Sequence, residues 1–129
     1  MEQTLNKDFF IKKFMAIPDD KWIANGDMQD KEDPTKGCAL FHLGVNWDDA
    51  SKSDDTQANA LGNLLRSNLK KISETHPIAK LLIEKESDDD CDIKESIANN
   101  ESIIYLFNDG STKYDLHPKQ SLLMALEAI

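Results

Sequence analysis

The chain has 129 residues, a mass of 14.6 kDa and a formal net charge of −9, from 24 acidic and 15 basic residues. This length suits one domain over residues 1–129, and an apolar content of 40% is enough to form a hydrophobic core. The charge disfavours direct binding to nucleic acid, because phosphates repel an acidic surface and Arg66 is the only arginine.

The N-terminal residues contain no basic region followed by an apolar stretch, so they do not resemble a secretory signal. The apolar run 122–126 is far shorter than the ~20 residues that span a bilayer. Cys38 and Cys91 lie far apart and form no disulfide framework. We therefore expect a cytoplasmic protein with no membrane contact and no cofactor.

The first half of the chain alternates helical patterns with polar loops. Phe10, Phe14 and Ile17 recur at helical spacing, which predicts an amphipathic helix over residues 6–17. Residues 22–24 suit a short strand. The apolar run 38–45 suits a buried strand or a short helix, and the glycine at its end slightly favours the helix.

The second half contains the clearest helical pattern, a leucine-rich stretch over residues 56–73 that His76 and Pro77 end. Residues 78–83 suit either a helix or a strand. Residues 84–92 hold six acids and are predicted to be a solvated loop or a frayed helix start.

The last part of the chain predicts one strand and one helix. Residues 102–107 are rich in β-forming types and end at an Asn-Asp-Gly turn, and a final helix begins at Pro118. The predicted fold class is therefore mainly α (α+β), a small domain of four or more helices with one or two short strands.

Cys38 and His42 are the residues whose spacing suggests chemistry. In a helix they share a face, where a thiol and an imidazole could form a thiolate nucleophile, with Asn108 or Asp109 as the orienting group. The alternative is that Cys38 is a small core residue and His42 satisfies a backbone carbonyl. A zinc site using the same pair lacks the second close pair that structural zinc sites have, so no metal site is predicted.

The sequence resembles a family of small uncharacterised proteins encoded in bacterial and phage genomes. The resemblance runs nearly end to end and is carried by Trp22, the Cys-Ala-Leu-x-His-x-Gly stretch from Cys38 to Gly44, the Asn-Asp-Gly turn at Asn108, and Pro-Lys-Gln from Pro118. In that family Phe41 is often replaced by glycine. The resemblance implies no reaction.

The resemblance sharpens one hypothesis, in which Trp22, Cys38, His42, Asn108 and Asp109 meet in space. They would line one site, or form a structural knot in which Asn108 and Asp109 cap a corner, His42 donates to one of them and Trp22 covers it. The knot is the favoured interpretation.

Much of the negative charge lies in three stretches, residues 27–33, 48–55 and 84–92. A candidate acidic binding surface contains Asp54, Asp55, Asp88, Asp89, Asp90 and Asp92. The leading hypothesis is a non-enzymatic module that binds a protein, plausibly a basic one, as immunity proteins and phage inhibitors do. The alternative is a thiol-dependent hydrolase or transferase using Cys38 and His42.

Overall fold

The computed structural model describes residues 5–24, 29–46, 49–88 and 91–129. Its helices are α1 (Lys7–Met15), α2 (Ala39–His42), α3 (Thr56–Ser67), α4 (Leu69–Ile72), α5 (Pro77–Ser87), α6 (Cys91–Ala98), α7 (Asn100–Asp109) and α8 (Pro118–Glu127). Three 3-10 turns accompany them: η1 (Asp19–Lys21), η2 (Ala50–Lys52) and η3 (Gly110–Tyr114). The prediction of a mainly helical protein is confirmed.

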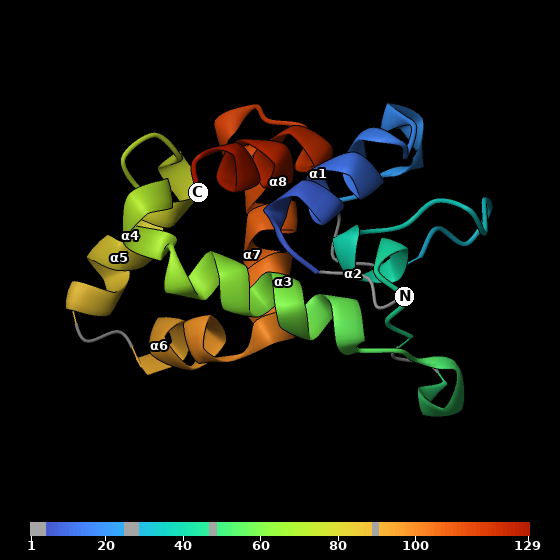
Figure 1. The fold of residues 1–129 in the computed structure, drawn as a ribbon, viewed down its shortest axis with the longest axis horizontal. Helices are drawn as coiled ribbons and strands as arrows, with labels where there is room; N and C mark the ends of the chain where they lie inside the picture. Colours follow the sequence, from blue (N-terminus) through green and yellow to red (C-terminus); the bar gives the residue numbers. More distant parts are fainter. Residues whose placement is uncertain (1–4, 25–28, 47–48, 89–90) are drawn as a thin grey trace.

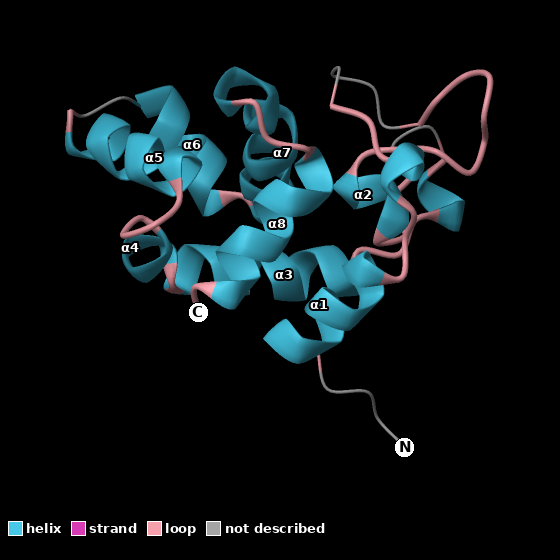
Figure 2. Ribbon diagram, turned by 90° about the horizontal axis from the view of Figure 1, so that it is seen from above, coloured by secondary structure: helices cyan, strands magenta, loops and turns pink. Residues whose placement is uncertain are grey.

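The predicted short strands are not confirmed. Over the described ranges the only extended pairings are isolated bridges of Gly37 with Trp22 and with Gln29, and Figure 2 draws no strand. Trp22 is therefore in extended backbone, as expected, but its bridge to Gly37 does not continue into a ladder.

The strand predicted for residues 102–107 is wrong, since these residues lie within α7. The Asn99 side chain caps this helix by accepting the backbone N–H of Ser102 at 2.9 Å. The β-branched Ile103 and Ile104 are fully buried there together with Phe107. Burial against neighbouring helices outweighs the small intrinsic preference of isoleucine for strands.

Other boundaries also differ from the sequence prediction. The stretch 56–73 forms two helices, because the chain bends at Asn68, whose side-chain amide donates to Leu64 O at 2.8 Å. Residues 78–83 lie within α5, which continues to Ser87 and so includes the first part of the acidic stretch.

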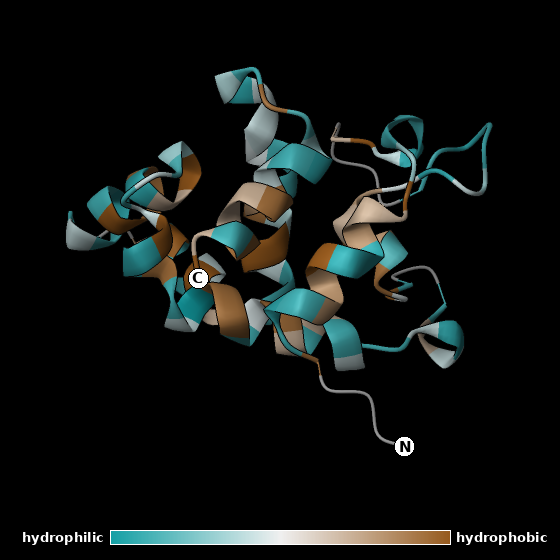
Figure 3. Cartoon of the chain, turned by 45° about the horizontal axis from the view of Figure 1, so that its top comes forward, coloured by the Kyte–Doolittle hydropathy of each residue, from teal (hydrophilic) through white to brown (hydrophobic). Residues whose placement is uncertain are grey.

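The helix α7 forms the centre of the molecule (Figure 1). It packs most extensively against α3, which crosses it, and also contacts α2, α6 and α8, while α1 packs on α8. Phe10, Phe14 and Phe107 are among the largest fully buried side chains. Hydrophobic segments lie on the central helices and hydrophilic ones on the outer loops (Figure 3).

No helix in the described part of the chain is both long enough and apolar enough to cross a membrane.

Candidate functional site

The structure brings the five residues of the predicted site together around the junction of α2 and α7. Asn108, in the last turn of α7 and 0% exposed, is at its centre. Its Oδ1 accepts the backbone N–H of Ala39 at 3.0 Å, and its Nδ2 donates to Ile23 O at 2.9 Å and to Asp109 Oδ1 at 2.8 Å. Asn108 therefore links the start of α2, the segment after η1 and its own neighbour.

Cys38 lies immediately before α2 and is 1% exposed. Burial raises the pKa of its thiol, and the carboxylate of Asp109 adds to this rise. A reactive cysteine requires access and a stabilised thiolate, whereas burial destabilises the charged form. The geometry thus places Cys38 in the core rather than at a reaction centre.

The His42 ring is packed against Trp22, with ring centroids 5.0 Å apart. Its Nε2–H donates to the carbonyl oxygen of Lys21 at 2.7 Å, and not to Asn108 or Asp109 as the knot hypothesis expected. Burial lowers the pKa of this imidazole. His42 is therefore a neutral hydrogen-bond donor to the backbone.

Trp22 is 4% exposed and its ring also contacts Phe14 edge-on, with centroids 5.4 Å apart. Its indole N–H has no hydrogen-bond partner among the described residues. Trp22 covers the junction, as the knot hypothesis expected.

A further arrangement extends beyond the predicted residues. In the segment formed by residues 17–23, four alternate carbonyl groups each accept a side-chain donor from a distant part of the chain. The pairs are Lys119 Nζ to Ile17 O at 2.8 Å, His117 Nε2 to Asp19 O at 2.8 Å, His42 Nε2 to Lys21 O at 2.7 Å and Asn108 Nδ2 to Ile23 O at 2.9 Å. These donors satisfy carbonyl groups of a segment that forms no regular strand, and the carbonyl oxygen of Lys21 also accepts the backbone N–H of Gly37 at 3.1 Å.

This arrangement gives most of the residues that carry the resemblance a structural role, and none of them needs a catalytic one. Trp22 lies in the segment, while His42, Asn108 and Lys119 supply donors to it. The sequence analysis singled out Trp22, His42 and Asn108. It did not identify Lys119 and His117 as hydrogen-bond donors to this segment. The signal was present, since both residues flank the Pro118 that begins α8.

In the described part of the chain, no group of three or more His, Cys, Asp or Glu side chains lies close enough together to hold a metal ion. The zinc alternative would need Cys38 and His42 to be joined by such groups.

The candidate acidic surface is divided between two ends of the molecule. Asp54 and Asp55 precede α3, whereas Asp88 and Asp92 flank the connection from α5 to α6, near the opposite end of α3 (Figure 1). Asp89 and Asp90 lie outside the described residues. The described members therefore do not form one continuous face.

Several loop carboxylates bind the chain itself instead of facing a partner. The acceptors and their backbone donors are Asp30 with Glu32 and Asp33, Asp33 with Thr35, Asp49 with Ser51, and Asp54 with Thr56. These are local turns in which a carboxylate takes the place of a backbone acceptor. Asp33 also pairs with Lys21 at 2.7 Å, and that hydrogen bond is the main reason that its pKa lies well below the usual range.

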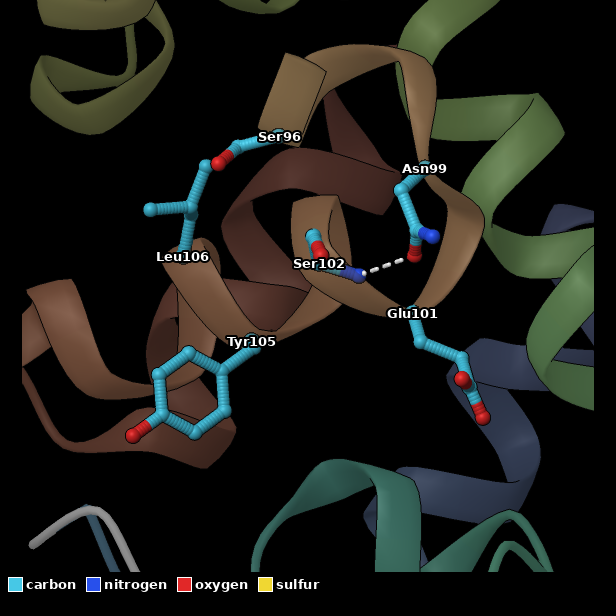
Figure 4. A pocket seen from close by; sticks show the side chains of 6 residues that line it. All are labelled: Ser96, Asn99, Glu101, Ser102, Tyr105 and Leu106. Carbon is cyan, nitrogen blue, oxygen red and sulfur yellow. Dashed lines mark hydrogen bonds between the residues drawn. The ribbon is translucent and has the colours of Figure 1, made fainter. Parts of the chain in front are cut away.

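Two of the surface cavities lie along α7 and α8, away from the junction. One, of about 510 Å³, opens along α7 beside the end of α6 and is lined by polar side chains with Tyr105 and Leu106 (Figure 4). The other, of about 530 Å³, lies between α1 and α8. Its lining residues are Met15, Asp19, His117, Lys119, Gln120, Leu123, Met124 and Glu127. We call this second one the α1–α8 cavity.

No protein-family model, curated protein or solved structure matches this chain. The resemblance to small bacterial and phage proteins therefore stays a prediction.

Proposed function

We propose that the protein acts by binding another protein, without catalysis, and that this partner is basic. The observation that carries the proposal is the α1–α8 cavity, whose apolar lining consists of Met15, Leu123 and Met124. Met15 is 60% exposed and lines this cavity together with Leu123 and Met124, so it belongs to a shared apolar surface and is not a single exposed side chain. Methionine adapts its shape to a partner, and protein interfaces are enriched in it.

The charges around this cavity support a basic partner. Lys119 Nζ pairs with the Asp19 carboxylate at 2.8 Å, which leaves Glu127 as a lining carboxylate that no described cation pairs. The net charge of −9 adds long-range attraction for a positively charged protein. An apolar centre with a polar and acidic rim fits a basic surface that presents an apolar side chain.

An inhibitor of the immunity-protein or phage-inhibitor class would act in this way, by occupying a basic site on its target. No geometric feature favours the alternative, a hydrolase or transferase using Cys38 and His42, because the sulfur is buried and its pKa is raised.

The test compares capture of host proteins at low salt by the wild-type chain and by a Met15→Gln, Met124→Gln double variant. Tyr114→Gln is the matched control, since Tyr114 is the other exposed large apolar side chain among the described residues and lies outside the cavity. We expect a basic protein that the wild type and the control retain, that the double variant loses, and whose binding weakens as salt increases.

Capture that is identical for all three proteins would place any interface elsewhere and contradict the proposed surface. Failure of the wild type to retain any basic protein, while an unrelated acidic binder does so in parallel, would contradict the proposed function itself.

A further inference from the structure

Histidine residues begin two of the helices, and in both cases a proline follows. Nδ1 of His76 accepts the backbone N–H of Ile78 at 3.2 Å and so caps α5. Nδ1 of His117 accepts the backbone N–H of Lys119 at 3.1 Å and so caps α8. In each case the imidazole performs the role that Ser, Asp or Asn usually has at a helix N-terminus.

The second ring nitrogen of each histidine binds a carbonyl on another element. His76 Nε2 donates to Ser121 O at 2.9 Å, and Ser121 lies in the first turns of α8. His117 Nε2 donates to Asp19 O at 2.8 Å and ties the start of α8 to η1. The two rings therefore hold the same end of α8 from two sides.

Both rings can make this pair of bonds only as the neutral Nε2–H tautomer. Protonation places a hydrogen on Nδ1, which then faces a backbone N–H and can no longer accept from it. We propose that His76, His117 and the first turns of α8 form an acid-sensitive latch, in which protonation of the rings uncaps α5 and α8 and loosens the start of α8.

The surroundings of His76 oppose its charged form. The ring is 1% exposed, lies edge-on to Phe107 with centroids 5.0 Å apart, and has Ser121 Oγ at 3.3 Å. Burial lowers its pKa, and no described charged group on α4, α5, α7 or α8 contributes to the shift. A proton on this ring would therefore be uncompensated, so its gain requires local opening.

The surroundings of His117 are different, because charged groups face it from both neighbouring elements. The Asp19 carboxylate of η1 would attract an imidazolium, while Lys119 of α8 neutralises that carboxylate at 2.8 Å. Glu127 lines the same cavity, and Met15 of α1 brings no charge. His117 and the start of α8 thus form one wall of the α1–α8 cavity, but the latch stands whether or not a partner docks there.

Hydrogen exchange of the intact chain, followed by NMR from about pH 7 to about pH 4.5, tests the latch above the usual range of carboxylate titration. The reporters are the amides of Ile78 and Lys119, whose bonds are to the two rings. We expect their protection factors to fall about fivefold or more, as loss of a cap requires, and to fall by more than those of α3, which follow the stability of the whole protein.

His117→Asn supplies the matched variant, because asparagine caps a helix but does not titrate in this range. It should keep protection of Lys119 at neutral pH and abolish its pH dependence, leaving that of Ile78 intact. If His76→Asn does not fold, the imidazole nitrogen shifts of the wild type still decide the matter. An Nδ1–H tautomer in either ring, or protection that is independent of pH at both amides, would overturn the latch.

Discussion

The side chain of Asn108 holds together segments that are far apart in the sequence. It joins the N–H of Ala39 to the carbonyl of Ile23, across 69 and 85 residues respectively. Separately, the main-chain carbonyl oxygen of Asn108 accepts the hydroxyl of Ser111, a residue of η3, at 2.7 Å. The Ala39 N–H and the Ile23 carbonyl are buried, so neither could turn to water if the side-chain amide of Asn108 were lost.

We expect Asn108→Ala to lower the free energy of unfolding by about 2 to 4 kcal/mol, because two buried backbone groups lose their partner. Urea unfolding with an unchanged m-value measures the difference. Thr112→Ala is the control, since that exposed hydroxyl makes one bond to Asp109 O at 3.2 Å. A loss no larger than that of the control would show that the amide is not central.

At the scale of elements, the crossing of α3 over α7 depends on Gly62. A Cβ added to Gly62 would lie 2.5 Å from Cα and Cβ of Asn100, at the first residue of α7. Arg66, one turn later on α3, donates to Asn100 Oδ1 at 2.7 Å and to the carbonyls of Ile97 and Ala98 at 3.3 and 3.2 Å. The close approach of α3 to α7 thus lets Arg66 donate hydrogen bonds to the carbonyl groups at the end of α6.

Gly62→Ala should therefore destabilise the protein by about 1 to 3 kcal/mol, although alanine normally stabilises a helix interior. The comparison is Gly110→Ala, where the added Cβ would meet only Ile78, at 3.4 Å from its Cδ1. The stability of the Gly110→Ala variant should differ little from that of the wild type. Thermal unfolding of both proteins distinguishes the two sites, and equal melting temperatures would mean that the crossing relaxes without cost.

At the scale of the whole molecule, several of the carboxylates behind the net charge of −9 are engaged in hydrogen bonds within the chain. Hydrogen bonds lower the pKa of four carboxylates. Lys119 donates to Asp19 and Lys21 to Asp33, while backbone N–H groups donate to Asp30 and Asp54. Much of the acidity of the loops is thus used to order turns.

These shifts predict the direction of acid unfolding. Because the folded pKa values lie below the unfolded value of ~3.9, the unfolded chain binds more protons, and stability falls as pH drops below about 4. His42 and His76 also have lowered pKa values. Their contribution to the stability of the folded protein is therefore lost at a higher pH, from about pH 6.5 downwards.

Melting temperature measured against pH should therefore decline in two stages. Asp33→Asn should flatten the stage below pH ~4 and leave the histidine stage unchanged. A melting temperature that is constant between about pH 7 and pH 2 would contradict the assigned hydrogen bonds.

The sequence predicted the helical class and the places where several helices begin, because these depend on local signals. Asn6, the step from His117 to Pro118 and the periodic leucines of α3 act within a few residues of themselves, whereas the step from His76 to Pro77 predicts only the end of the preceding helix. The meeting of the five junction residues is a hypothesis suggested by the resemblance alone, not by these local signals. The sequence misjudged residues 102–107, since the same isoleucines suit a strand or a helix until their packing partners are present.

The role of the junction could not be predicted from residue types, because a cysteine, a histidine and an asparagine serve equally in a catalytic site or in a core. Burial of Cys38 and the carbonyl partners of His42 and Asn108 decide between these, and all of them come from long-range contacts. The sequence by itself determined a helical, acidic domain. Only the tertiary structure decided which polar groups are satisfied internally, because that depends on which distant segments lie within hydrogen-bonding distance.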